Sequence, residues 1–436
     1  MIRVNPPSVL MIPIPETRFP EQDRILLRVA RAFPGTRTFA LGRAESNAPF
    51  GVPWVLALEI PGFMRPVFLW PEILDGLPDE AWWVSPDLRQ EEMELFAECQ
   101  RGIVIETMID GDDPRALWRR QVILAMALGE DAPFYYDDSA MRVITRAAAE
   151  DIAEMPLPPS AQDLMSQHAV YDEQNRELLW VHTHGLGRTG VPDIEAFRVR
   201  GEQHGMASQL IGIVADRQID AKDFYGEPML LGPGIMVELI PIEEALELLD
   251  PADVGASADD RQDHGAFRAA LALPSAAKDK GGFSFTSTRR KSLRLDSLLS
   301  YIERENLVYC TDSESEKMAH MARYRWPLFL ALWRNREGDE WEFLVKTAFR
   351  TTGSDSMPWE HLWFEVRTIT PDGIECELIN DPINVPSLKR GHVMMLQPES
   401  ITDWSVSTSA VLYDPRNAAR LASYPGVILV APKPVH

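Results

Sequence analysis

Two segments near the C-terminus alternate apolar and polar residues with the period of two that a β-strand requires. Residues 341–349 place large apolar side chains on one face, and residues 361–367 do the same. A Pro-Asp-Gly turn at 371–373 then leads into a further apolar segment at 374–379, which is typical of a hairpin. Such strands bury one face, so we predict a curled antiparallel sheet or small barrel packed on a helix, with residues 314–325 as that helix.

The first 250 residues combine helical and strand patterns. Apolar runs predict strands in β-α-β-β type units, at residues 9–14, 38–41, 52–60, 66–70 and 102–109. Helices are expected at residues 21–33, 86–100, 113–128, 139–153 and 160–167. The fold class is therefore α+β, with a mixed α/β N-terminal region.

The length of 436 residues exceeds what one hydrophobic core usually organises. We predict a mixed α/β domain over residues 1–250, with a sub-boundary near the proline-rich residues 155–160. Residues 251–310 are rich in Ala, Ser, Asp and Lys and are expected to form a linker with a short helix. Residues 311–436 form the β-rich C-terminal module.

The formal net charge of −23 would repel phosphate backbones, so nucleic acid is a poor partner. The acidic surface either contacts a basic protein partner or serves solubility alone. Three widely spaced cysteines fit a reducing compartment, and no stretch has the length of a membrane helix. We expect a soluble cytoplasmic protein that does not bind membranes; the pattern does not predict its oligomeric state.

Residues 181–197 contain the densest group of candidate functional side chains. His182 and His184 are two apart on a predicted strand, so both rings leave one face, as paired metal ligands do. Asp193 or Glu195 could return on the next strand as a third ligand, and Arg188 could bind a carboxylate or phosphate. Such a metal ion would activate water for hydrolysis.

The competing interpretation of this motif is structural. Both faces of residues 178–184 carry apolar side chains, so the strand is expected to be buried on both sides and its histidines hydrogen-bonded. We favour this interpretation, which predicts no cofactor and no metal, and His182 and His184 remain the metal candidates.

Other catalytic patterns are weak. Residues 185–190 match G-x-G-x-x-G, but a strand follows in place of the required helix, so Gly185 and its neighbours are expected to form a turn with positive φ. Residues 275–278 match S-x-x-K by chance, because the companion motifs of that enzyme class are missing. Whether the chain is an enzyme is uncertain, and the pattern favours a non-enzyme.

The C-terminal module offers candidates for a recognition surface, because tryptophans beside carboxylates make good protein contacts. The alternative is that the second tryptophan fills the end of the barrel while the carboxylate before it caps a turn. The candidates are Trp363, Glu365, Asn380, Asp403 and Trp404.

Several of these segments resemble known bacterial families. Residues 341–349, 360–382, 387–396 and 401–404 resemble the family called domain of unknown function 2314. The N-terminal and central part, from the motif HAVYDEQNRELLWVHTHGLGRTGVPDIEAF, resembles domain of unknown function 4026, which in that family precedes the same C-terminal module. Neither resemblance implies an activity, and a distant similarity to barrel domains suspected in toxin immunity is associational.

Two functions are thus predicted. The first is a non-enzymatic binding or interaction protein, of an immunity or stress type, whose partner is a basic protein. The second is a metal-dependent hydrolase that uses His182, His184 and a nearby carboxylate.

Overall fold

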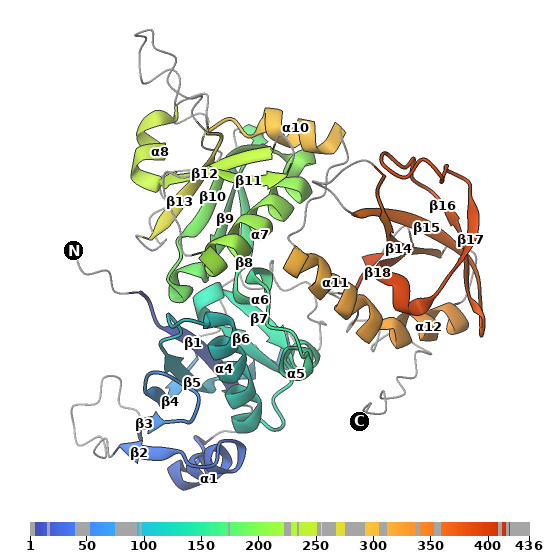
Figure 1. The fold of residues 1–436 in the computed structure, drawn as a ribbon. Helices are drawn as coiled ribbons and strands as arrows, with labels where there is room; N and C mark the ends of the chain where they lie inside the picture. Colours follow the sequence, from blue (N-terminus) through green and yellow to red (C-terminus); the bar gives the residue numbers. More distant parts are fainter. Residues whose placement is uncertain are drawn as a thin grey trace. The chain divides into compact units, whose positions relative to one another are not determined.

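The computed structural model describes residues 5–14, 18–39, 53–74, 94–95, 98–172, 175–221, 228–232, 235–250, 254, 267–274, 293–304, 312–336, 341–352, 359–408, 412–415 and 418. The chain divides into two compact units, Met1–Tyr309 and Cys310–His436 (Figure 1). Most of the helix predicted at residues 86–100 lies outside the described residues, as do Cys310 and residues 275–278.

The first sheet of the N-terminal unit has, within the described residues, seven strands in the order β2-β3-β4-β5-β1-β6-β7. Its strands are β1 (Ser8–Ile14), β2 (Arg37–Phe39), β3 (Leu56–Glu59), β4 (Val67–Ile73), β5 (Arg101–Thr107), β6 (Phe134–Asp137) and β7 (Arg142–Thr145). Helices α1 (Gln22–Ala32), α4 (Pro114–Leu128) and α5 (Arg146–Glu154) contribute to the core on one of its faces. The Asp113 carboxylate caps α4 by accepting from the Ala116 amide, as the Asp-Pro sequence predicted.

The helix predicted at residues 139–153 is wrong in its first half. A 3-10 turn (Asp138–Ala140) is followed by Met141 in the left-handed region (φ 49°), and β7 then pairs with β6. The helix α5 begins only at Arg146, after Thr145 caps it by accepting from the Ala148 amide. Pairing of the β-branched Val143 and Ile144 with the two tyrosines of β6 thus overrides the helical spacing.

The second sheet of this unit has six described strands in the order β11-β12-β13-β10-β9-β8. They are β8 (Ser166–Asp172), β9 (Asn175–His184), β10 (Asp193–Arg200), β11 (Met229–Gly232), β12 (Ile235–Pro241) and β13 (Arg268–Ala272). Helices α6 (Ala161–Leu164), α7 (His204–Ala221) and α10 (Asp296–Arg304) pack on one face, and α8 (Ile242–Leu248) on the other. The helix predicted at 160–167 therefore ends at Leu164, where β8 follows after one residue.

Residues 268–272, which the composition assigned to a linker, form a strand inside this sheet. β13 pairs in parallel with β10 and antiparallel with β12, and four of its five residues are buried. Ala269, Ala270 and Ala272 are small, and together with Leu271 they fit between the helices that cover the two faces. The polar residues on both sides of this short segment led to its prediction as part of a linker.

The C-terminal unit contains one antiparallel sheet in the order β17-β16-β15-β14-β18-β19. Its strands are β14 (Glu342–Arg350), β15 (Trp359–Thr370), β16 (Gly373–Leu378), β17 (Val393–Leu396), β18 (Ile401–Ser407) and β19 (Leu412–Tyr413). Helices α11 (Asp312–Tyr324) and α12 (Trp326–Asn335) pack on one face, and α12 begins beside Pro327 as predicted. The described strands form a curled, open sheet and not a closed barrel.

A buried ion pair joins the two sheets of the N-terminal unit. Arg188, in the turn after β9, donates to both carboxylate oxygens of Asp137 on β6 at 2.7 and 2.8 Å, and neither side chain is exposed. The guanidinium also donates to the Ser8 hydroxyl at 3.0 Å and to the Leu164 carbonyl at 2.6 Å. Arg188 therefore binds a carboxylate, one of the two ligands expected for it, and that carboxylate is a buried one of the same unit.

Among the described helices, none combines the length and the apolar character needed to cross a membrane.

Arg188→Met should lower the free energy of unfolding of the N-terminal unit by about 3–5 kcal/mol, because Asp137 would stay buried without its counter-ion. Urea titration followed by circular dichroism measures this loss. The matched control is Arg200→Met, because the pair of Arg200 with Glu202 is exposed and 3.8 Å long and contributes about 0–1 kcal/mol. Equal effects of the two substitutions would contradict the role given to the buried pair.

Candidate functional site

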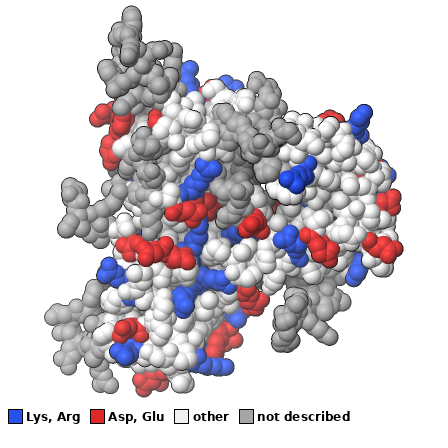
Figure 2. Space-filling model, viewed as in Figure 1, with Lys and Arg blue, Asp and Glu red and all other residues white. Residues whose placement is uncertain are grey.

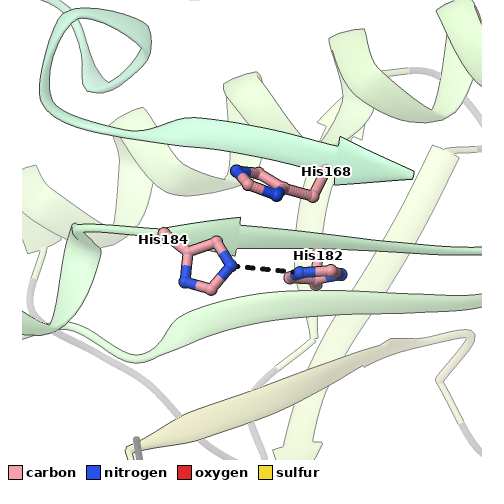
Figure 3. A group of neighbouring side chains, drawn as sticks. All are labelled: His168, His182 and His184. Atoms are coloured by element: carbon pink, nitrogen blue, oxygen red, sulfur yellow. Dashed lines mark hydrogen bonds between the residues drawn. The ribbon is translucent and has the colours of Figure 1, made fainter. Parts of the chain in front are cut away.

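Three histidines from two neighbouring strands share one face of the second sheet. His168 on β8 lies directly opposite His182 on β9, and Ser166 lies opposite His184. Alternate residues of a strand point to the same side, so this register brings all three imidazoles together. Figure 3 shows His182 and His184 turned toward each other, with His168 on the adjacent strand.

The imidazoles are close enough to share one ion. The Nε2 atoms of His182 and His184 are 3.1 Å apart, and one ligand nitrogen from each of the three residues lies within 4.8 Å of the others. Two nitrogens bound to one tetrahedral zinc ion at about 2.0–2.1 Å would be about 3.3 Å apart. The pair from β9 therefore already has nearly the separation of two ligands of one ion.

Burial keeps these rings in place. His182 is 3% exposed and His168 is 9% exposed, whereas His184 is only half-buried. The Trp180 indole stacks on the His182 ring with centroids 3.9 Å apart and an interplanar angle of 22°. The expectation that both faces of β9 are buried is correct, since Trp180 belongs to the core under α8 and Val181 to the core under α7.

The third ring was not among the sequence candidates. The sequence predicts the third ligand on the strand that follows the motif, and the structure provides His168 on the strand that precedes it. The helix expected over residues 160–167 covers the start of β8. The remaining signal is that Ser166 and His168 have the same spacing as His182 and His184. It becomes visible only once the register of the hairpin is known.

Asp193 stabilises the turn after β9 and does not belong to the histidine cluster. Its carboxylate accepts from the Thr183 hydroxyl at 2.9 Å and from the Leu186 amide at 3.1 Å. Burial raises the pKa of Asp193 to about 6, although these hydrogen bonds favour the ionised form. The carboxylate thus holds the segment that begins immediately after His184.

Glu195 is likewise not part of the cluster, which corrects its prediction as a possible ligand. It lies opposite His182 on β10, fully buried, and accepts from the Trp180 indole at 3.0 Å and from Arg268 at 2.7 Å. Burial raises the pKa of Glu195 to about 7, against the opposing effect of the Arg268 charge.

The glycines of the motif form a turn, as predicted. Gly185 and Gly190 have φ of 105° and 89°, and between them runs a 3-10 turn, Leu186–Thr189, followed by β10. A Cβ atom at Gly185 would lie 2.6 Å from the Leu164 carbonyl oxygen, so only glycine fits there. Because no helix follows the third glycine, the motif lacks the geometry that binds a dinucleotide.

The recognition residues predicted in the C-terminal unit do not form one surface. Trp404 is fully buried and donates to the Ala322 carbonyl at 3.0 Å, so its assignment to a surface is wrong and its alternative as a core residue is correct. Asp403 accepts from the Trp404 amide, and Asn380 accepts from the Trp363 amide. Trp363 and Glu365 lie on the opposite face of the sheet from the core.

The titration of Glu195 predicts a pH-dependent stability of the metal-free protein. Between about pH 4.5 and pH 7, Glu195 is protonated in the folded state and ionised in the unfolded chain, so the folded state binds more protons. Its contribution to the free energy of unfolding therefore falls as pH rises through this window, by at most about 1.4 kcal/mol per pH unit.

Glu195→Gln removes this titration. In denaturant titrations with a chelator present, its free energy of unfolding relative to the wild type should increase from pH 4.5 to pH 7 and then level off. A difference that stays constant over this range would show that Glu195 titrates at its ordinary pKa in the folded protein.

Comparison with known proteins identifies two family segments. Residues 167–271 match the family described as "Protein of unknown function (DUF4026) C-terminal", a segment that includes the three histidines and β13. Residues 331–415 match "Uncharacterized protein conserved in bacteria (DUF2314)". No curated protein and no solved structure matches the chain. The two matches follow one another in the order that the sequence resemblance predicted, and the first of them covers the central part of the chain.

Proposed function

We propose that this protein binds one divalent transition metal ion, of the zinc type, through His168, His182 and His184. The observation that carries the proposal is the convergence of three imidazoles with ligand atoms within 4.8 Å of one another. Imidazole nitrogen suits zinc, copper, iron and nickel, whereas magnesium and calcium prefer oxygen ligands. The donor set therefore favours a transition metal.

The number of ligands favours a reactive centre over a purely structural one. Structural zinc sites have four protein ligands, whereas catalytic sites have three and leave a position for water or substrate. In the described part of the chain, three residues belong to the cluster, and the half-buried His184 marks its accessible side. A metal ion here would lower the pKa of a bound water, so the reaction class is metal-assisted hydrolysis.

The packing also favours a metal ion over a hydrogen-bonded set of structural histidines. The 3.1 Å contact between the Nε2 atoms of His182 and His184 accommodates one proton, because two N–H groups cannot face each other at that distance. A metal ion replaces that proton and attracts all three nitrogens. All three imidazoles then coordinate the same ion.

Purified protein should therefore contain, or take up, one zinc ion per chain, measured by elemental analysis after dialysis. His182→Ala combined with His184→Ala should abolish this binding, and His168→Ala should weaken it by at least about 10-fold. Zinc should also raise the melting temperature of the wild type, because a ligand that binds only the folded state stabilises it.

His361→Ala is the matched control, because His361 lies in the C-terminal unit outside the cluster and contacts the Thr402 hydroxyl. This variant should retain one zinc ion per chain. If the wild type binds no zinc, cobalt or nickel, or if the double variant binds as well as the wild type, the proposed metal function is incorrect.

A second candidate function is protein interaction through the face of the C-terminal sheet that α11 and α12 leave open. Here Glu365 and Glu377 lie directly opposite each other, an unfavourable pair on an exposed surface, although Arg367 contacts Glu377. On the edge strand β17, Val393 and Met395 are 45% and 47% exposed. Apolar side chains beside excess acidic charge suit a basic partner segment. On the face of the molecule that Figure 2 shows, in contrast, basic and acidic residues are interspersed.

A lysine-rich peptide with leucines at alternate positions should bind this face at low salt, measured by fluorescence anisotropy. Trp363→Ala and Glu365→Lys should each weaken binding by at least about 5-fold, since a central tryptophan contributes more than about 1 kcal/mol to such contacts. Glu243→Lys makes the same charge change on α8 and should have little effect. Equal binding by all variants would exclude this face. An immunity or stress role stays a prediction.

A further inference from the structure

A tryptophan links the histidine cluster to a buried ion pair on the same face of the second sheet. Trp180 precedes His182 by two residues on β9, so its indole lies on the same side, and it stacks on the His182 ring with centroids 3.9 Å apart. Stacking at this distance leaves the imidazole little room to turn about its bond to Cβ. The position of the indole therefore determines the direction of the His182 nitrogens.

The indole is in turn held by a carboxylate. Its N–H donates to the Glu195 Oε2 at 3.0 Å, and Arg268 on β13 donates to the other carboxylate oxygen at 2.7 Å. Glu195 is fully buried, and Arg268 is largely buried as well. The hydrogen bond from the charged guanidinium is the stronger of the two, and in these surroundings it keeps the carboxyl group in one orientation.

Both oxygens of Glu195 are thus engaged away from the rings. This arrangement makes Glu195 a poor candidate for a metal ligand or a proton acceptor, because either role would require it to release Trp180 or Arg268. Holding the Trp180 indole in place, in contrast, lets Glu195 keep both of these hydrogen bonds. The chain of contacts runs from Arg268 through Glu195 and Trp180 to His182 across three neighbouring strands, β13, β10 and β9.

We infer that Glu195 is a positioning residue of the metal site, which fixes the His182 ring for coordination by holding the Trp180 indole against it. This inference rests on the proposed metal function. It differs from the usual arrangement, in which a carboxylate accepts directly from the ligand imidazole. Here the indole transmits the constraint, so the effect of Glu195 on the metal depends on the presence of the Trp180 N–H.

A double-mutant cycle on the full-length protein tests this dependence, with zinc affinity measured by competition against a chromophoric chelator. Glu195→Gln replaces one acceptor by a donor and cannot satisfy both the indole and the guanidinium. It should weaken zinc binding about 10-fold, the lower end of the range for residues that orient metal ligands. Trp180→Phe keeps a ring against His182 but removes the N–H, and should cause a similar loss.

The decisive variant combines the two substitutions. Because Glu195 acts through the indole, Glu195→Gln in the Trp180→Phe background should weaken zinc binding by less than about 2-fold further, so the losses do not multiply. The d–d absorption of bound cobalt should change in Glu195→Gln as the geometry of His182 relaxes. Glu243→Gln, which removes an exposed carboxylate of α8, is the control and should leave affinity and spectrum unchanged.

The outcomes separate this inference from the metal function itself. If the wild type binds zinc while the two losses multiply, or while Glu195→Gln binds within about 2-fold of the wild type, the inference is wrong and the metal function stands. Melting temperatures of the metal-free variants show whether all of them fold. If the folded wild type binds no metal, the proposed function fails, and the inference fails with it.

Discussion

The buried pair of Arg188 and Asp137 is the interaction on which the N-terminal unit depends. Its two charges lie out of contact with water, and the hydrogen bonds of Nη1, Nη2 and both carboxylate oxygens offset the cost of that burial. Four segments meet at this guanidinium: β1, β6, the end of α6 and the turn after β9. That turn begins one residue after His184, so the pair also anchors one end of the histidine cluster.

Polar side chains therefore occupy the interior of the second sheet in an ordered way. Asp193 holds the turn after β9, Glu195 holds Trp180, and the three imidazoles come from β8 and β9. Buried polar groups are tolerated when they are satisfied, and they then specify one arrangement of the chain. A sheet covered by helices on both faces would be expected to bury apolar residues alone. The buried polar residues named above are exceptions, and they lie in and beside the proposed metal site.

Sequence patterns predicted the elements whose signals are local. Alternation identified the strands of the C-terminal sheet, and the cap at Asp113 identified the start of α4. Pairing between strands decided the rest: β7 pairs with tyrosines of β6 in spite of a helical pattern, and β13 lies inside a sheet in spite of polar flanks. Trp404 is buried because α11 supplies the carbonyl acceptor for its indole, a partner distant in sequence.

The same limit applies to the candidate site. His182 and His184 could be predicted from their spacing, but His168 could not, because its approach depends on the register of β8 against β9. Register also determines the position of Glu195. It places this residue opposite His182, where the carboxylate oxygens accept from Trp180 and Arg268. Residue types and spacing indicated candidate metal ligands in this segment, and only the pairing of strands showed which side chains lie close enough to share one ion.

The central claim is that three imidazole nitrogens converge on one metal ion, and X-ray absorption at the zinc edge tests it most directly. For zinc-loaded wild-type protein the account predicts a first shell with three imidazole nitrogens at about 2.0–2.1 Å, completed by one oxygen ligand. A first shell that contains sulfur, or only carboxylate and water oxygens, would contradict it, because the ion would then be bound elsewhere.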